Sequence, residues 1–174
     1  MPPPLLVSSV RYTDQATTKV YWVPSIAAST LVPTRAEMNA GTNVSGELNL
    51  FTSATGGGGG SSGGWTVTPE RIDTQNITQA FKTEIAGSLS VTDPSLTFFA
   101  SKTGSDVRSL LPVGTNGFVM FCDGGDTAGN LGQVFPVSVA AVSVVRVDGG
   151  RDATKITINF VITGVPNLTV TVPA

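Results

Sequence analysis

The sequence contains no histidine and only one cysteine, Cys122. Catalysis by a Ser-His-Asp or Cys-His arrangement is therefore excluded, as are metal sites built from histidine or from several cysteines. A single cysteine cannot form a disulfide within the chain, so the fold does not depend on oxidation. Because no basic partner accompanies Cys122 in the sequence, we expect a buried, unreactive thiol.

Charged residues are also scarce, at 13% of the 174 residues, whereas about 25% is usual in soluble domains. Ten basic residues and twelve acidic ones give a net charge of −2. This balance argues against a nucleic-acid-binding protein, which needs a clustered basic face. The low charge has two interpretations: an ordinary small β domain, or a surface covered largely by other copies of the chain, since interface cores are depleted of charge.

Long hydrophobic runs are absent as well. The most apolar stretch, residues 137–147, includes Arg146 and is shorter than the roughly 20 residues that a transmembrane helix needs. Residues 1–6 have neither the positive segment nor the apolar core of a secretory signal. We therefore expect no membrane insertion, and the chain length suggests one domain.

Residues that favour strands are abundant. Val, Thr and Ile account for 52 of the 174 residues, and their β-branched side chains fit a pleated sheet better than a helix. Twenty Gly and eleven Pro supply turns between strands. The composition predicts a mainly β fold.

Local patterns place two strands and a helix near the start of the chain. Residues 1–17, with three prolines, are expected to form an extended arm. Residues 19–23 read as a strand, and 34–41 as a helix. Thr34 and Glu37 have the spacing of a capping box, and Gly41 suits a left-handed C-terminal cap. Residues 44–51 are predicted to be the second strand.

The later segments are also mostly strands. Strands are predicted over residues 65–68, 83–91, 95–101, 117–121, 134–147 and 155–163, with a second helix over 106–111 capped by Ser105. The segment 134–147 is apolar on both faces, so it is either buried on both faces or carries a bulge near Ala140 and Ala141. Residues 168–172 are a final strand or an exposed tail.

Two glycine-rich segments imitate known binding motifs. Gly58, Gly60 and Gly63 match the dinucleotide fingerprint, but no strand-turn-helix unit surrounds them, so we expect a mobile loop. This tract is predicted to lie at the tip of a long hairpin between residues 44–51 and 65–68. The segment Asp123–Asp126 lacks the spacing of a calcium-binding loop and is interpreted as a turn with solvated carboxylates.

Residues 70–84 are polar and without a clear pattern. Ile72, Ile77 and Phe81 are candidate core anchors within them. The carboxylates of the chain are scattered, and an enzyme that uses two of them would need a concave acidic cleft. No catalytic residue, metal ligand or cofactor-binding residue is predicted, and we expect no enzyme activity.

Several short motifs follow one another in an order that is typical of one protein family. These are Lys19–Pro24, Pro33–Thr42, Gly64–Trp65, Asp93–Phe99, Ser105–Pro112, Gly117–Val119, Asp123–Asp126, Val134–Val137 and the strand from Ile156. Over about residues 18–164 they resemble the tail tube (major tail) proteins of long-tailed bacteriophages, and most closely the type found in phages of actinobacteria. The flanking residues 1–17 and 165–174 are then an N-terminal arm and a C-terminal tail.

The resemblance implies a structural protein of the virion. It implies a mainly β fold, a β-sandwich or barrel of the tail tube type with one or two short helices. Copies of this fold are expected to form hexameric rings that stack into the tail tube through which phage DNA is delivered. The implied partners are other copies of the chain, a tape-measure protein, and tail-terminator and tip proteins, with DNA passing the lumen without specific binding. The implied location is the virion tail, assembled in the host bacterial cytoplasm.

Two segments are candidates for contacts between subunits. The glycine-rich loop at 53–64 is the candidate inter-ring contact, with the site residues Thr55, Gly56, Gly57, Gly58, Gly59, Gly60, Ser61 and Ser62. The arm is the candidate inter-subunit contact, with Pro2, Pro3, Pro4, Leu5 and Leu6. The alternative function is a binding module, either a capsid decoration protein or an Ig-like adhesive domain. We also expect acidic residues to lean toward the channel.

Overall fold

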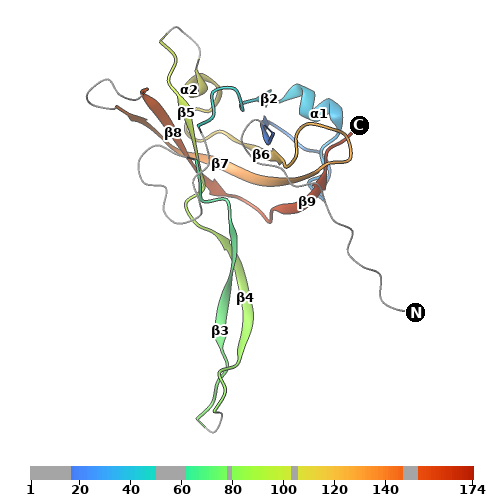
Figure 1. Ribbon diagram of the computed structural model, residues 1–174, viewed down its shortest axis with the longest axis vertical. Coiled ribbons are helices and arrows are strands. Elements are labelled where there is room, and N and C mark those ends of the chain that lie inside the picture. Colours follow the sequence, from blue (N-terminus) through green and yellow to red (C-terminus); the bar gives the residue numbers. More distant parts are fainter. Residues whose placement is uncertain (1–16, 50–61, 78–79, 103–105, 147–152) are drawn as a thin grey trace. The chain divides into compact units, whose positions relative to one another are not determined.

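The computed structural model describes residues 17–49, 62–77, 80–102, 106–146 and 153–174 (Figure 1). These residues form two compact units. The described part of the first comprises residues 17–45, 118–135 and 166–174, and the remaining described residues make up the second. The chain is mainly β, with two short helices in its described part, as the composition predicts. No helix in that part is long and apolar enough to cross a membrane.

The first unit is built on antiparallel strands. Its elements are β1 (Lys19–Val23), α1 (Arg35–Ala40), β2 (Thr42–Asn43), β9 (Asn167–Thr171) and portions of β6 (Asn116–Cys122) and β7 (Leu131–Val145). Strand β1 pairs with β2 and, over its whole length, with β6. Strand β9 pairs with the start of β7, so the last predicted segment of the chain is a strand.

The second unit contains the longer strands. Its elements are β3 (Val67–Asp73), β4 (Glu84–Val91), β5 (Ser95–Phe99), α2 (Val107–Leu110), β8 (Lys155–Ile162) and the rest of β6 and β7. Strand β8 pairs antiparallel with both β5 and β7. Hydrogen bonding links the strands in the order β2-β1-β6-β7-β8-β5, with β9 on β7, whereas β3 and β4 form a separate two-stranded sheet.

Helix α1 begins as the sequence predicts and ends differently. The Thr34 hydroxyl accepts from the Glu37 amide, and the Glu37 carboxylate accepts from the Thr34 amide, which completes the capping box. The prediction of a left-handed Gly41 is wrong, because its φ is −80°. Glycine is needed there for space: a Cβ atom would lie 2.5 Å from the Trp22 carbonyl oxygen. The extended backbone at Gly41 leads directly into β2.

Helix α2 is one turn long and has a different cap from the one predicted. Asp106 is the N-cap, and its carboxylate accepts from the Arg108 amide. Ser105, the predicted cap, lies outside the described residues. Asp and Ser are both good N-caps, so the sequence alone does not choose between two adjacent candidates.

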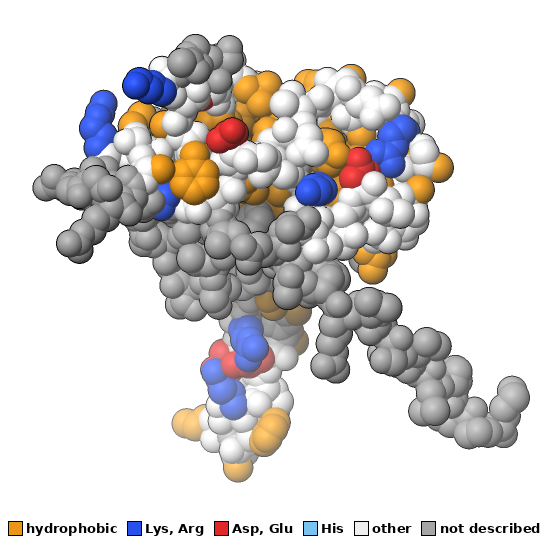
Figure 2. Space-filling model, turned by 45° about the horizontal axis from the view of Figure 1, so that its top comes forward, with side chains coloured by type: hydrophobic (Ala, Val, Ile, Leu, Met, Phe, Trp, Pro, Cys, Tyr) orange, Lys and Arg blue, Asp and Glu red, His pale blue; other side chains and the backbone are white. Residues whose placement is uncertain are grey.

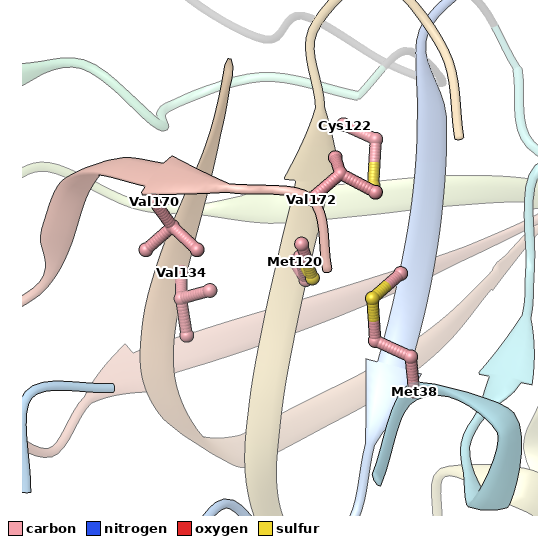
Figure 3. Packing of buried hydrophobic residues seen from close by; sticks show 6 residues of the cluster. All are labelled: Met38, Met120, Cys122, Val134, Val170 and Val172. Atoms are coloured by element: carbon pink, nitrogen blue, oxygen red, sulfur yellow. The ribbon is translucent and has the colours of Figure 1, made fainter. Parts of the chain in front are cut away.

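The first unit buries a small sulfur-rich core. Figure 3 shows its side chains, which come from α1, β6, β7 and the C-terminal segment and are Met38, Met120, Cys122, Val134, Val170 and Val172. Cys122 is fully buried, and burial, reinforced by Asp126 and Asp123, raises its pKa to about 12. The predicted buried thiol is confirmed, and Met38 fixes α1 on this core.

Strands β7 and β8 follow the patterns of their sequences closely. In β8, Ile156, Ile158 and Phe160 are buried, and the residues between them are more exposed. In β7, the pairing with β8 shifts register between Val139 and Ala141, so the predicted bulge is present. Residues 134–137 are also buried on both faces. Burial on both faces therefore holds for the first part of β7, and the bulge is present in its middle.

The predicted strand over 44–51 is wrong in its described part. Asn43 ends β2 and accepts the Ser45 amide on its side chain, which turns the chain. Ser45 in turn bonds both backbone groups of Val20. The chain then pairs briefly with β5, where Leu48 bridges Phe98. Local Asx chemistry at Asn43 overrides the strand propensity of the apolar residues that follow.

The predicted place of the glycine tract in a long hairpin is also wrong. The long hairpin is β3–β4, and residues 50–61 lie outside the described part. Gly63 exchanges two backbone hydrogen bonds with Ser95 of β5, of 2.8 and 3.0 Å. Ser62 donates to the Asn49 carbonyl, so the residues flanking 50–61 lie side by side. Strand β3, which starts at Val67, pairs instead with β4, the next strand along the chain.

Candidate assembly surface

The β3–β4 hairpin has almost no core of its own. All of its described residues are exposed except Val67, Gly87 and Val91, which are half-buried. The predicted core anchors are therefore wrong: Ile72 is 45% exposed, Phe81 79%, and Ile77 fully. Ile85 and Leu89 are 55% and 65% exposed. A two-stranded hairpin cannot bury such side chains against itself.

The hairpin is anchored at its base by backbone and aromatic contacts. Trp65 donates from Nε1 to the Ser95 carbonyl at 3.0 Å, and its ring packs 5.5 Å from the ring of Phe160. Gly64 has a φ of +81°, and a Cβ atom there would overlap the backbone of Asp93. The chain therefore enters β3 in a defined direction set by β5 and β8.

The register of β3 and β4 assigns each residue to a face. Ile72 lies opposite Ile85, so both side chains share one face. Arg71 opposes Ala86 and Asp73 opposes Glu84 on the other face. The register shifts between Pro69 and Arg71, because Gly87 and Ser88 together oppose Glu70. As a result Leu89, opposite Pro69, lies on the same face as Arg71.

Charged residues on this hairpin are paired with one another. The Lys82 ammonium lies 2.6 Å from Glu84 and 4.0 Å from Asp73. Arg71 lies 3.5 Å from the same Glu84 carboxylate. The hydrogen bond from Lys82 holds the pKa of Glu84 below its usual value. Figure 2 shows hydrophobic side chains beside acidic and basic ones at this end of the molecule.

A second polar cluster, in the first unit, ties four segments together. The Tyr21 hydroxyl donates to Asp126 at 2.6 Å, and Arg35 binds the same carboxylate at 2.7 Å. Arg35 also donates to the Pro173 carbonyl at 2.6 Å. The prediction of a solvated Asp126 is therefore wrong. The bonds of Asp126 link the turn before β7 to β1 and α1, and the bond from Arg35 to Pro173 links α1 to the C-terminal segment.

Tyr21 of this cluster and the buried thiol of Cys122 predict a loss of stability at high pH. Burial, with the Asp126 hydrogen bond, raises the pKa of Tyr21 to about 12, and burial raises that of Cys122 to about 12. Folding favours the protonated form of both groups, so their contribution is complete at pH 8 and is lost as pH rises from about 9 to 12. Thermal unfolding across this range should show the fall, and the double variant Tyr21→Phe, Cys122→Ala should flatten it. An equally steep fall in the variant would contradict the assignment.

Of the contact residues predicted from the sequence, the structure describes only Ser62. Ser62 is fully buried, where its hydroxyl accepts from the Thr97 amide at 2.9 Å. The other predicted loop residues, Thr55–Ser61, and the arm residues Pro2–Leu6 lie outside the described part of the chain. The exposed apolar hairpin was missed because its hydrophobic residues follow no single period. In the described part, no three Cys, Asp or Glu side chains group as metal ligands.

Comparison with known proteins identifies the family. A family model described as "Phage tail tube protein" matches residues 8–174. The chain belongs to the phage tail tube protein family. The match takes in α1, the β3–β4 hairpin and β9, so the resemblance read from the motifs is confirmed. This tail tube protein is therefore a structural component of the phage tail. No curated protein matches it.

One solved structure is similar in fold to this tail tube protein. It is a chain of the "Cryo-EM structure of the anti-feeding prophage (AFP) baseplate, 6-fold symmetrised". The match covers 94% of this chain and 96% of that one, with a TM-score of 0.55 and 9% sequence identity. At this identity the likeness concerns the fold alone. It supports the mainly β fold of the tail tube type.

Proposed function

We propose that copies of this tail tube protein assemble into rings that stack into the tube of a phage tail, through which DNA is delivered. The observation that carries the proposal is the β3–β4 hairpin, which exposes five large hydrophobic side chains: Ile72, Ile77, Phe81, Ile85 and Leu89. Water opposes such exposure. Contact with further copies of the same chain would remove it.

We also propose a ring number and a set of partners. The similar baseplate structure was symmetrised with six-fold symmetry, which supports rings of six. Tape-measure, tail-terminator and tip proteins are the proposed partners inside and at the ends of the tube. DNA would pass the lumen without specific binding. The role is structural, without enzyme activity, and its place is the virion tail after assembly in the host cytoplasm.

The arm and the glycine-rich loop remain proposed contact segments. We propose that Pro2–Leu6 contact a neighbouring subunit, and that Thr55–Ser61 contact the adjacent ring. Ser62 would act at the base of that loop, because its buried hydroxyl already bonds Thr97 and Asn49. A Ser62→Ala variant would remove both bonds while leaving residues 53–61 unchanged.

Electron microscopy of the purified full chain tests the proposal. We expect regular rings or tubes above a critical concentration, and sedimentation should show the loss of monomer at the same concentration. A small defined oligomer that binds a capsid lattice or a glycan would instead support the binding-module alternative. A preparation that stays monomeric at all concentrations, and also with a tape-measure protein, would reject the tube.

A further inference from the structure

Strand β5 is the last strand in the hydrogen-bonded order of the seven-stranded sheet, with β8 on one side. Its other side is covered by two short segments of the same chain, residues 47–49 and 62–63, which we call the edge cap. Each segment meets β5 through an isolated bridge rather than a strand ladder, at Phe98 and at Ser95. The backbone groups that another strand would use on this side of β5 are therefore taken by the chain itself.

The edge cap bonds the backbone of alternate β5 residues at both ends of the strand. Ser95 exchanges two hydrogen bonds with Gly63, of 2.8 and 3.0 Å. At the other end, the Phe99 amide donates to the Glu47 carbonyl at 2.9 Å. Since the two edges of a strand are served by alternate residues, Thr97 presents the outward groups at the centre of this edge.

The centre of the edge depends on a side chain. The Ser62 hydroxyl accepts from the Thr97 amide at 2.9 Å and donates to the Asn49 carbonyl at 3.3 Å. The Asn49 amide in turn donates to the Thr97 carbonyl at 2.7 Å. Ser62 and Thr97 are both fully buried, so these bonds are shielded from water. One hydroxyl thus links both segments of the edge cap to the middle of β5.

The sequence of β5 makes an open edge hazardous. Residues 95–101, Ser-Leu-Thr-Phe-Phe-Ala-Ser, contain no charge, no proline and no glycine. This composition is typical of segments that aggregate when their edge is open. Strands β3 and β4 carry charged residues that form ion pairs, and charge discourages pairing at an edge. Because β5 has no charged residue, closure of its edge depends on the edge cap.

We infer that the edge cap closes β5 of the free subunit to strands of other chains, and that the Ser62 hydroxyl holds the cap in place. The inference concerns the subunit before assembly and goes beyond the proposed function. Without this hydroxyl, the Thr97 amide would lose its acceptor and the Asn49 carbonyl its donor. Buried polar groups without a partner are costly, so the centre of the edge would open and accept a strand from a second copy, giving irregular β aggregates.

The variant Ser62→Ala tests this role, with Thr97→Val as the matched control. The control also removes a buried hydroxyl, which lies 3.0 Å from the Thr157 hydroxyl, but it leaves the backbone bonds of the edge in place. Both full-length variants are held at the same interval below their own unfolding temperatures, at a concentration where no tubes form. Ser62→Ala should form aggregates that bind a cross-β dye at least about tenfold faster than the control.

A charge added to the edge separates strand pairing from a general loss of stability. Phe99 is 36% exposed, and its ring lies 5.9 Å from the Lys155 ammonium. The substitution Phe99→Glu therefore places a carboxylate on β5 near a lysine. Combined with Ser62→Ala, it should return aggregation to within about threefold of the control rate. The unfolding temperature should not recover, because the bonds of Ser62 are still absent.

Amide hydrogen exchange in the wild-type chain tests the edge cap without any substitution. The Ser95, Thr97 and Phe99 amides should be protected to within about tenfold of those in β8, which pairs on both sides. Fast exchange of the Thr97 amide, or equal aggregation rates of Ser62→Ala and Thr97→Val, would overturn the inference. So would a double variant that aggregates as fast as Ser62→Ala alone. None of these measurements needs tubes, so a failure to form tubes counts against the proposed function alone.

Discussion

Replacing residues 69–89 with an Asn-Gly turn between Thr68 and Ser90 is expected to abolish tube assembly without unfolding the protein. Thr68 and Ser90 are directly opposed, and a two-residue Asn-Gly loop suits such a pair. Among the described residues of 69–89, the deletion removes all the exposed apolar side chains of the hairpin and no fully buried one. Electron microscopy and sedimentation should find monomers where the wild type forms tubes, at an unfolding temperature close to that of the wild type.

The control for this truncation is deletion of Gly56–Gly60. The sequence predicts that this deletion impairs tube growth and leaves thermal unfolding nearly unchanged. Comparing tube assembly by the two variants therefore shows which segment, the hairpin or the glycine-rich loop, contributes more to contacts between copies. Normal tubes from the truncated hairpin would rule it out as the main contact. A large fall in unfolding temperature in either variant would show that the segment belongs to the folded core.

The variant Phe135→Ala is expected to produce the opposite result, a large loss of stability. Phe135 is fully buried, and its ring meets that of Phe121 edge to face, with centroids 5.8 Å apart. Removing a buried phenylalanine side chain costs about 3–5 kcal/mol, a large share of the roughly 5–15 kcal/mol that stabilises a typical protein. Differential scanning calorimetry should find an unfolding temperature lower by roughly 6–20 °C.

Phe81→Ala is the matched control for Phe135→Ala. The side chain removed is the same, but Phe81 is 79% exposed, so the free energy of unfolding should change by less than about 0.5 kcal/mol. Its effect should appear in assembly, as a higher critical concentration. A loss of stability as large as that of Phe135→Ala would mean that Phe81 packs in the core of the free subunit.

The parts of the fold predicted correctly depend on neighbours in the sequence. The capping box needs only Thr34 and Glu37, three residues apart, and it forms as predicted. Strand β8, predicted over residues 155–163, needs only the alternation of its residues: Ile156, Ile158 and Phe160 are buried, and those between them are more exposed. The order of short local motifs over about residues 18–164 was sufficient to predict the family.

The incorrect predictions share a different cause, because contacts distant in sequence decided them. Gly41 was expected to be left-handed, but the carbonyl of Trp22 requires a residue without a side chain in an extended conformation. The long hairpin was assigned to the glycine tract, but Gly63 pairs with Ser95 and leaves Val67 to pair with β4. Neither Trp22 nor Ser95 is identifiable as a partner from local pattern.

The scarcity of charge, the excess of β-branched residues and the motif order determined by themselves that this is a mainly β tail tube protein. The tertiary structure alone decided which hydrophobic residues are core and which are surface. Leu96 and Leu89 both lie in strands, yet one is buried and the other exposed, because β5 has a sheet beside it and β4 has only β3. Burial depends on which strands pair, and pairing partners lie far apart along the chain.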